Sequence, residues 1–193
     1  MRKLISFMHV SLDGFVAGPS GEMDWIIMDE EIFRDAIDLA ATTDTALYGR
    51  KTYQMMEGYW PGVLTNPNST TLERCHAAWI ENIHKIVFSK TLQNVEWNNT
   101  RLIKENVAEK ISRLKQKQGK SMMIFGSPKL THSFMRMNLI DEYRLNVNPV
   151  VLGSGIPFFE NIDHTIDLRL LKTKKFNSGV VGFFYEQKII SNK

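Results

Sequence analysis

Short apolar runs alternate along the chain with segments in which apolar side chains recur every three or four residues. Residues 4–10 form such a run, and a run of this length predicts a β-strand. In 30–41 the apolar side chains instead fall at positions i, i+3, i+4 and i+7 counted from Phe33, which predicts an amphipathic helix. The same reasoning predicts further strands at 45–48, 85–89, 101–104, 121–125, 142–147, 168–175 and 180–189, and further helices at 50–56, 70–80, 107–119 and 128–137.

The order of these elements predicts an α/β fold. Strands and helices alternate over the first two thirds of the chain, and the last third is predicted to be sheet, with 168–175 and 180–189 joined by an Asn-Ser-Gly turn at 177–179. We expect a three-layer α/β/α arrangement, with a mixed, mostly parallel central sheet and a C-terminal antiparallel hairpin. The segment 61–68, rich in proline and asparagine, is predicted to be a loop. No linker or repeat is visible, so we expect one domain over 1–193.

Composition narrows the class of protein. The chain has 193 residues, of which 43% are hydrophobic, and its longest apolar runs are far shorter than the roughly 20 residues that cross a bilayer. The single cysteine, Cys75, cannot form an intrachain disulfide, which favours a cytoplasmic protein. A net charge of +3 is small for a nucleic-acid partner but is compatible with a small anionic ligand. The five histidines lack metal-ligand spacing, so no metal is expected.

Loops that follow strands carry the candidate chemistry, because ligands of open α/β sheets bind at the carboxyl ends of the strands. The loop 11–18 follows the first strand and is rich in glycine, which suits positive φ angles or close approach to a ligand. It could equally be a simple connection between elements.

A second junction passes directly from a strand into a helix through Gly49, Arg50, Lys51 and Thr52. A helix N-terminus has unpaired backbone N–H groups and a partial positive charge, which favour phosphate. Two cations in this first turn repel the helix dipole unless an anion is present, so they indicate an anion site. The alternative is a solvated basic turn in which Thr52 caps the helix.

A third junction repeats the order strand, glycine, helix at Gly126, Ser127 and Lys129. Plain capping by Ser127, with a proline at the first helical position, is the structural alternative. Two such junctions in one sheet would suit a dinucleotide pyrophosphate. Ser89 and Lys90, at another strand end, either bind a ribose 2′-phosphate, which would favour NADPH over NADH, or form a solvated turn.

The motifs in this order resemble those of the dihydrofolate reductase superfamily, and most closely the reductase domain of bacterial riboflavin biosynthesis and its stand-alone relatives. The resemblance covers nearly the whole chain, although no deaminase domain is attached and a paired glycine of the riboflavin reductases is replaced at 125–127. The motifs that carry it are Ser-Leu-Asp-Gly at 11–14, Asp-Trp at 24–25, Tyr-Gly-Arg-Lys-Thr at 48–52, Ile-Val-Phe-Ser-Lys at 86–90, Met-Ile-Phe-Gly-Ser at 123–127, Asp-Glu-Tyr at 141–143 and Pro-Val-Val-Leu-Gly-Ser-Gly at 149–155.

The resemblance implies a reductase that takes hydride from NADPH and transfers it to a C=N or C=O bond of a flat, nitrogen-rich heterocycle. The activity of a 5-amino-6-(5-phosphoribosylamino)uracil reductase is the example it suggests. The cofactor residues that it implies are Val16 and Ala17 at the nicotinamide, Gly49, Arg50 and Thr52 at the pyrophosphate and 2′-phosphate, Ser89 and Lys90 at the adenosine phosphate, and Gly126, Ser127 and Lys129 on the other side of the pyrophosphate.

Two carboxylates are candidates for assisting proton transfer. Asp29 fits the position of the folate reductases' carboxylate on the first helix, and Asp24 lies in the preceding loop. The alternative for either residue is a helix-start carboxylate, since acids are favoured in a first helical turn. A protein that binds NADPH or a related metabolite without turnover is the alternative function, and a basic module acting on nucleic acid is the third.

A homodimer is also expected. The alternating apolar side chains Tyr143, Leu145 and Val147 would supply a sheet-mediated contact between two copies, and such dimers are common among the relatives.

Overall fold

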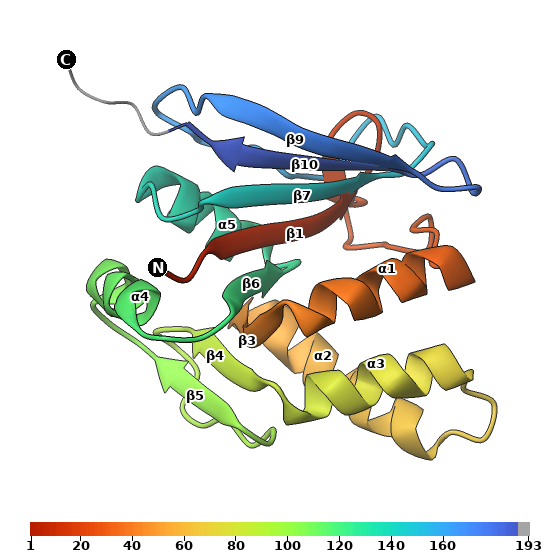
Figure 1. Ribbon diagram of the computed structural model, residues 1–193, viewed down its shortest axis with the longest axis horizontal. Helices are drawn as coiled ribbons and strands as arrows, with labels where there is room; N and C mark the ends of the chain where they lie inside the picture. The colour runs from red at the N-terminus through yellow and green to blue at the C-terminus, as the bar shows by residue number, and fades with distance from the viewer. Residues whose placement is uncertain (189–193) are drawn as a thin grey trace.

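A sheet of eight strands lies at the centre of the molecule, of which the computed structural model describes residues 1–188 (Figure 1). The strands are β1 (Leu4–Val10), β2 (Phe15–Ala17), β3 (Thr43–Gly49), β4 (His84–Phe88), β5 (Thr100–Ile103), β6 (Ser121–Phe125), β7 (Glu142–Val147), β8 (Ile156–Pro157), β9 (Leu168–Lys175) and β10 (Val181–Gln187). The helices are α1 (Glu30–Ala41), α2 (Arg50–Thr65), α3 (Thr71–Asn82), α4 (Val107–Gln116) and α5 (Pro128–Arg136).

The strand order of the large sheet is β5-β4-β3-β6-β1-β7-β10-β9. Only β10 runs antiparallel to its neighbours β7 and β9, and the other pairs in this sheet are parallel. The predicted mixed sheet with a C-terminal hairpin is therefore confirmed. The last strand ends at Gln187 among the described residues, and Ile189, where the predicted strand ended, lies outside them.

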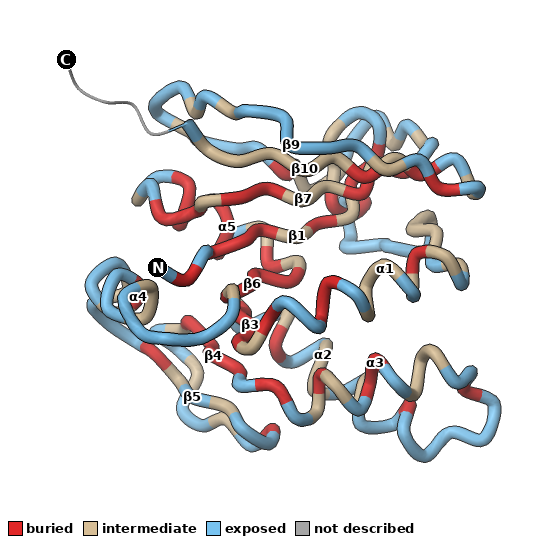
Figure 2. Tube along the Cα trace, viewed as in Figure 1, coloured by how far each residue is buried: buried red, intermediate tan, exposed pale blue. Residues whose placement is uncertain are grey.

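Helices cover both faces of the sheet, and each face has its own hydrophobic core. Successive strand residues point to opposite faces, so Leu47 packs with α4 and α5 while Ala46 and Tyr48 pack with α1, α2 and α3. Figure 2 shows the central strands as the most continuously buried part of the chain. The three-layer α/β/α fold is thus confirmed.

The parallel strands bring several loops to one edge of the sheet. Gly49, the last residue of β3, is paired with Phe88, the last residue of β4, and Phe7 of β1 is paired with Phe125 at the end of β6. The segments that follow β4, β3, β6 and β1 consequently emerge next to one another. These are the segments in which the sequence placed its candidate ligand-binding residues.

Helix α2 is longer than its sequence predicted. A helix ending at Met56 and a loop beginning at Pro61 were expected, but the helix continues past Pro61. That proline removes one backbone hydrogen bond and disfavours a helix interior. The expectation is wrong because the helix is packed on both sides of the proline: before it, the rings of Trp60 and His76 of α3 lie 4.7 Å apart, and after it Val63 is buried.

A small antiparallel sheet of β2 and β8, which the sequence did not predict, stands beside the large one. Next to it, the Asp13 carboxylate accepts hydrogen bonds from the Ser11 hydroxyl at 2.6 Å and from the backbone N–H groups of Gly153 at 2.8 Å and Leu152 at 3.2 Å. These bonds lower the pKa of Asp13, the Ser11 hydroxyl contributing most. Asp13 therefore joins the loop after β1 to the segment before β8.

Tyr143 is buried within its own chain, with 1% of its surface exposed, and Leu145 and Val147 pack against the same core. These three residues therefore contribute to the internal core, and Leu145 and Val147 are only half-buried in it. The homodimer itself stays a prediction, which sedimentation at micromolar concentration would test. Within residues 1–188, none of the helices combines the length and the hydrophobicity that spanning a bilayer requires.

Candidate active site

The two junctions of strand, glycine and helix are in direct contact. The backbone N–H of Gly49, before α2, donates to the Ser127 hydroxyl, before α5, at 3.0 Å. A Cβ atom added to Gly126 would lie 3.5 Å from the Cγ2 of Thr52. The tertiary structure thus brings together the two helix N-termini that the sequence suggested for one pyrophosphate.

Neither of these helices is capped by a side chain. Gly49 is the N-cap of α2, so Thr52 lies inside the helix and the expectation that it occupies the capping position is wrong. Ser127 does occupy the N-cap of α5, but its hydroxyl binds Gly49 and the carbonyl of Phe125 instead of the first turn. Plain capping by Ser127 is therefore also wrong. Both helices keep N–H groups that an anion can accept from.

The backbone between β6 and α5 has an unusual shape. Gly126 and Ser127 are consecutive residues in the left-handed region, with φ of 58° and 55°. Glycine adopts this conformation without strain, whereas a serine there is uncommon and often marks a functional turn. The turn positions the Ser127 hydroxyl for its bond to Gly49, and this bond links the two junctions.

Four cations lie near this edge of the sheet without a carboxylate partner among the described residues. Arg50 and Lys51 begin α2, Lys129 is in the first turn of α5, and Lys90 follows β4. All four are exposed, whereas the Ser89 hydroxyl accepts the backbone N–H groups of Thr91 and Leu92 and so forms a turn. The cations are free to meet an anion from solvent.

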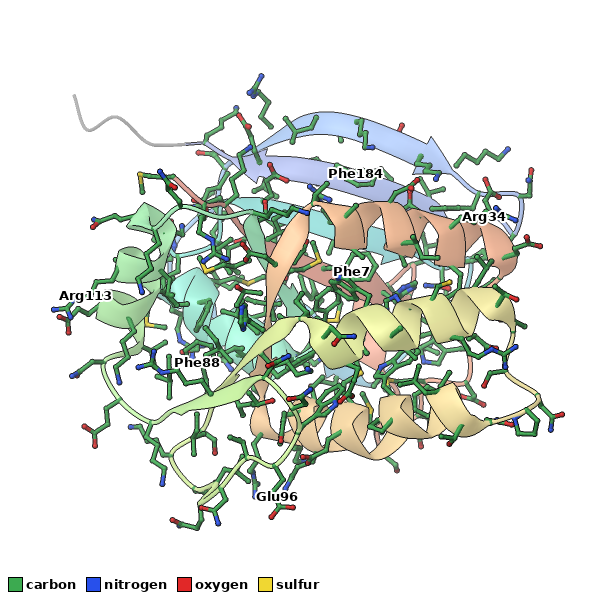
Figure 3. All side chains as sticks on the ribbon, turned by 60° about the horizontal axis from the view of Figure 1, so that its bottom comes forward. Phe7, Arg34, Phe88, Glu96, Arg113 and Phe184 are labelled. Atoms are coloured by element: carbon green, nitrogen blue, oxygen red, sulfur yellow. The ribbon has the colours of Figure 1, made fainter. Side chains whose placement is uncertain are left out.

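A cavity of about 510 Å³ opens beside these junctions, between the sheet and the helices α1, α2 and α3. Figure 3 looks onto this side of the molecule and labels Phe7 of β1, which lines the cavity. The predicted cofactor residues that line it are Val16, Ala17, Lys51, Thr52, Gly126 and Ser127. Those that do not are Gly49, Arg50, Ser89, Lys90 and Lys129.

Neither predicted catalytic carboxylate lines the cavity. Asp29 is the N-cap of α1 and accepts the backbone N–H of Ile32 at 2.9 Å, which is the helix-start alternative. Asp24 is exposed, and its neighbour Met23 contributes to the lining. No Asp or Glu side chain lines the cavity in the described part of the chain.

Two histidines that the sequence pattern did not single out line the cavity from different sides. His9 lies on β1, and His76 lies on α3 among the rings of Phe33, Trp60 and Trp79. The Nδ1 atom of each imidazole is enclosed and has no hydrogen-bond partner among the described residues. Burial lowers the pKa of both to about 4, so both are neutral at pH 7. The place of His9 near the end of an apolar strand was the available signal.

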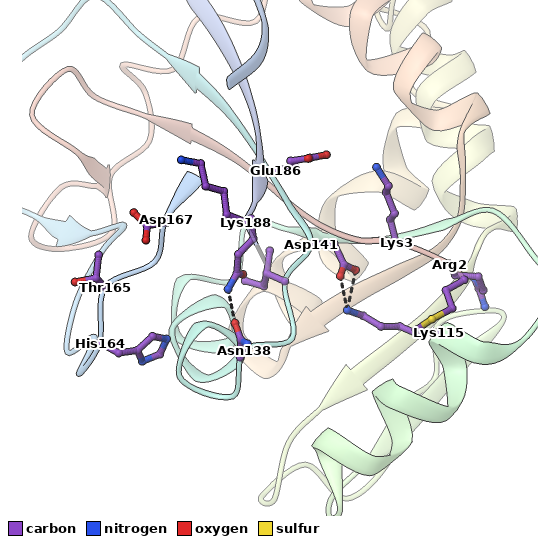
Figure 4. Close-up of a pocket in the computed structure, with 13 residues that line it drawn as sticks. Arg2, Lys3, Lys115, Asn138, Asp141, His164, Thr165, Asp167, Glu186 and Lys188 are labelled. Atoms are coloured by element: carbon purple, nitrogen blue, oxygen red, sulfur yellow. Dashed lines mark hydrogen bonds and ion pairs between the residues drawn. The ribbon is translucent and has the colours of Figure 1, made fainter. Parts of the chain in front are cut away.

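A larger cavity, of about 920 Å³, lies at the opposite edge of the sheet (Figure 4). Most of the residues that line it are polar or charged, but the cations near β1 are neutralised by carboxylates: Lys115 by Asp141 at 2.7 Å and Lys3 by Glu142 at 2.6 Å. It also lies away from the helix N-termini and from the carboxyl ends of β3, β4 and β6. We therefore regard the smaller cavity as the candidate active site. Within 1–188, no group of His, Cys, Asp and Glu side chains could hold a metal ion.

Comparison with known proteins gives the family of the chain. The sequence pattern of the RibD C-terminal domain matches residues 2–182. The chain belongs to the RibD C-terminal domain family. The uncharacterized protein YyaP of Bacillus subtilis is 36% identical over 185 residues, covering 95% of this chain and 94% of that protein.

Solved structures show the same fold for this RibD C-terminal domain. A putative riboflavin biosynthesis protein from Shewanella sp. PV-4 has a TM-score of 0.76 at 22% identity, over 97% of this chain and 99% of that one. A deaminase/5-amino-6-(5-phosphoribosylamino)uracil reductase from Thermotoga maritima has a TM-score of 0.67 at 12% identity, over 97% and 57%. Dihydrofolate reductase from Enterococcus faecalis, complexed with NADP(H), has a TM-score of 0.62 at 14% identity, over 97% of both.

Proposed function

We propose that this RibD C-terminal domain is an NADPH-dependent reductase of a small, flat heterocycle. Membership of the family supports a reductase-type oxidoreductase. The observation that carries the cofactor assignment is the pair of uncapped helix N-termini, joined by the bond from Gly49 to Ser127, beside a cavity and four unpaired cations among the described residues.

The chain supplies a binding group for each part of the cofactor. The N–H groups of 50–52 and of Ser127 bind the pyrophosphate, since helix N-termini stabilise phosphate. Gly49 and Gly126 instead donate to the Ser127 hydroxyl and to the Phe7 carbonyl, and they shape the turn around the pyrophosphate. Arg50 and Lys90, with Ser89, bind the 2′-phosphate, and Lys51 and Lys129 add positive charge. Val16 and Ala17, both buried on β2, border the nicotinamide. When bound, NADPH supplies the hydride, and the enclosed apolar wall excludes water from the reacting atoms.

The substrate accepts this hydride at a C=N or C=O bond. A cavity of about 510 Å³ has the size of an ordinary small-molecule site. Reduction of 5-amino-6-(5-phosphoribosylamino)uracil, the reaction named for the Thermotoga maritima protein, is the specific example. The role of Asp24 in proton transfer stays a prediction. A role of Asp29 in proton transfer would require its carboxylate to share or release the hydrogen bond that it accepts from the Ile32 N–H.

Titration of tryptophan fluorescence with NADPH and with NADH tests the proposal directly. Trp60 lines the cavity and Trp25 lies in the loop before α1, so binding is expected to change the emission. Tighter binding of NADPH than of NADH, followed by NADPH oxidation with a pterin, aminopyrimidine or quinone, is the expected result. Equal or absent binding of the two dinucleotides would contradict the proposal.

The charge of Arg50 is expected to select NADPH over NADH. Arg50→Ala removes a charge-assisted hydrogen bond to the 2′-phosphate and is expected to weaken NADPH binding by about 10- to 100-fold, with little change for NADH. The Kd values for both dinucleotides, measured by fluorescence, give the ratio. Arg113→Ala, at an exposed arginine on α4, is the matched control and should change neither. Equal losses for NADPH and NADH would remove Arg50 from the 2′-phosphate site.

One observation favours the alternative of binding without turnover. The described lining of the cavity contains no carboxylate to deliver a proton. Under this alternative NADPH binds with the same preference but is not oxidised by any member of a broad panel of heterocycles and carbonyl compounds. Steady oxidation with one of them would exclude it.

A further inference from the structure

The wall that α1 contributes to the cavity is apolar although the helix is rich in acidic residues. Ile32, Ala36 and Leu39 line the cavity from one face of α1. The carboxylates of α1 are directed elsewhere, since Glu31 accepts the backbone N–H of Asn177 and Asp35 pairs with Lys174 on β9. The described lining of the cavity thus has no group that would neutralise a protonated, amidine-like ring.

The described lining also has no second site for a phosphate. Lys51 is the only Lys or Arg in it, and this residue stands at the start of α2, within the pyrophosphate site of the proposed function. A phosphorylated substrate would have to share this cation with the cofactor. Burying a phosphate against apolar side chains without its own partner is strongly unfavourable.

Methionine side chains make the rim adaptable. Met23, Met28 and Met55 line the cavity and are each about two-fifths exposed, and Met8 and Met56 lie deeper. Methionine is flexible and polarizable, fills irregular gaps and contacts aromatic rings favourably. Such a rim accommodates an aromatic ring system with variable substituents.

The polar side chains left for a substrate in the described lining are the two neutral imidazoles. Lys51, Thr52 and Ser127 are assigned to the cofactor, and the Trp60 N–H donates to the Met56 sulfur at 3.0 Å. The Nδ1 atoms of His9 and His76 are enclosed without a partner among the described residues, and a buried N–H without an acceptor is more costly than an unused lone pair. This favours the tautomer with the proton on Nε2, the nitrogen left for a ligand. Each imidazole would then donate a hydrogen bond to an oxygen of the ligand.

We propose that the substrate of this site is an uncharged, flat, apolar carbonyl compound without phosphate, held by hydrogen bonds from His9 and His76 to its oxygen atoms. This inference rests on the proposed function for its hydride donor, and it replaces the heterocycle and the phosphorylated example given there with a neutral carbonyl compound. The carbonyl compound gains a hydride from NADPH and a proton from water, which yields the reduced hydroxy compound and NADP⁺. For a quinone, these two transfers give the hydroquinone.

Menadione, a neutral and flat dicarbonyl, is the probe, compared under anaerobic conditions with dihydrofolate and with a phosphorylated aminopyrimidine. We expect menadione to quench the emission of Trp60 and to support NADPH oxidation with a kcat/KM at least about tenfold above the other two. Faster reduction of the phosphorylated aminopyrimidine or of dihydrofolate would overturn the inference and leave the proposed function intact. Because quenching needs no cofactor, quenching without any binding of NADPH would instead refute the proposed function. Absence of quenching would refute the inference.

Variants of His9 test the hydrogen bond separately from activity. His9→Leu is expected to raise the Kd of menadione about tenfold, because it removes a hydrogen bond in an enclosed site, while the Kd of NADPH stays the same. His9→Gln keeps an N–H donor and should restore part of the affinity. His84→Gln, at an exposed histidine on β4, is the control, and thermal unfolding verifies that each variant is folded. Unchanged affinity in folded His9→Leu would show that His9 does not bind the carbonyl.

Discussion

Replacing Gly155 with alanine is expected to displace the small sheet and to weaken cofactor binding at least tenfold. The added Cβ atom would lie 2.2 Å from the backbone oxygen of Ala17, and the φ of Gly155 is +154°, which other residues rarely adopt. The Ala17 oxygen belongs to the backbone and cannot rotate away as a flexible side chain would. Either β2 or β8 must therefore move, and Val16 and Ala17 of the cavity wall are displaced. We expect the free energy of unfolding to fall by about 3 kcal/mol. Urea denaturation and NADPH titration measure the two effects.

Gly153→Ala is the matched control for this variant. Gly153 is in the same segment and also has a positive φ, of 74°, but an added Cβ atom would meet nothing within 4 Å. Only backbone strain is introduced, so a loss of about 1 kcal/mol with unchanged NADPH affinity is expected. Similar losses in both variants would show that strain, and not the contact with Ala17, determines the effect at Gly155.

Acid is expected to destabilise the protein through the two histidines of the cavity. Burial lowers the pKa of His9 and His76 from 6.5 to about 4 in the folded state. Between these pH values the unfolded chain binds protons that the folded chain does not, so stability falls as the pH falls. Each histidine contributes up to about 1.4 kcal/mol per pH unit, and the two together contribute about 4 kcal/mol between pH 6.5 and 4.5. Above about pH 7.5 both are neutral in either state and contribute almost no pH dependence.

Urea denaturation at a series of pH values measures this effect, with the double variant His9→Gln and His76→Gln as the comparison. Whatever the substitutions do to the stability at pH 7, the mean slope with pH between 6.5 and 4.5 should become shallower by about 2 kcal/mol per unit. His84→Gln, at an exposed position, should keep the slope of the parent protein. An unchanged slope in the double variant would show that the two imidazoles take up protons equally in the folded and unfolded states.

The junctions around Gly49 and Gly126 illustrate how much of the candidate site could be predicted. A strand that runs through glycine into a helix start is a local feature, so the sequence alone is enough to suggest that two of them bind a pyrophosphate. Whether their helix N-termini are capped is not local. The Ser127 hydroxyl binds Gly49, which is 78 residues away in the sequence, and this bond leaves the N–H groups of α5 uncapped. From the local sequence pattern alone, the Ser127 hydroxyl is expected to cap α5, the helix that it precedes.

The inner wall of the cavity could not be predicted for a related reason. Ile32, Ala36 and Trp60 have the pattern of ordinary core residues, and only the packing of α1, α2 and α3 leaves a space between them. The sequence suggests Asp29 as a catalytic residue because it is a carboxylate near the first helix. In the folded chain this carboxylate instead accepts the backbone N–H of Ile32. His9 gives only the weak signal of its place near the end of an apolar strand, because one histidine there shows no spacing to another. His76 is 67 residues away along the chain but lines the same cavity.

The sequence alone predicts the order of the elements in the large sheet, its mixed character with a C-terminal hairpin, and the edge at which the candidate ligand-binding loops emerge. These depend on periodicity and on the direction of parallel strands, which are encoded in short segments. Only the tertiary structure decided which side chains share the cavity, that no described carboxylate lines it, and that Gly155 must approach Ala17. These depend on contacts between distant segments, whose distances and burial arise when the three layers pack.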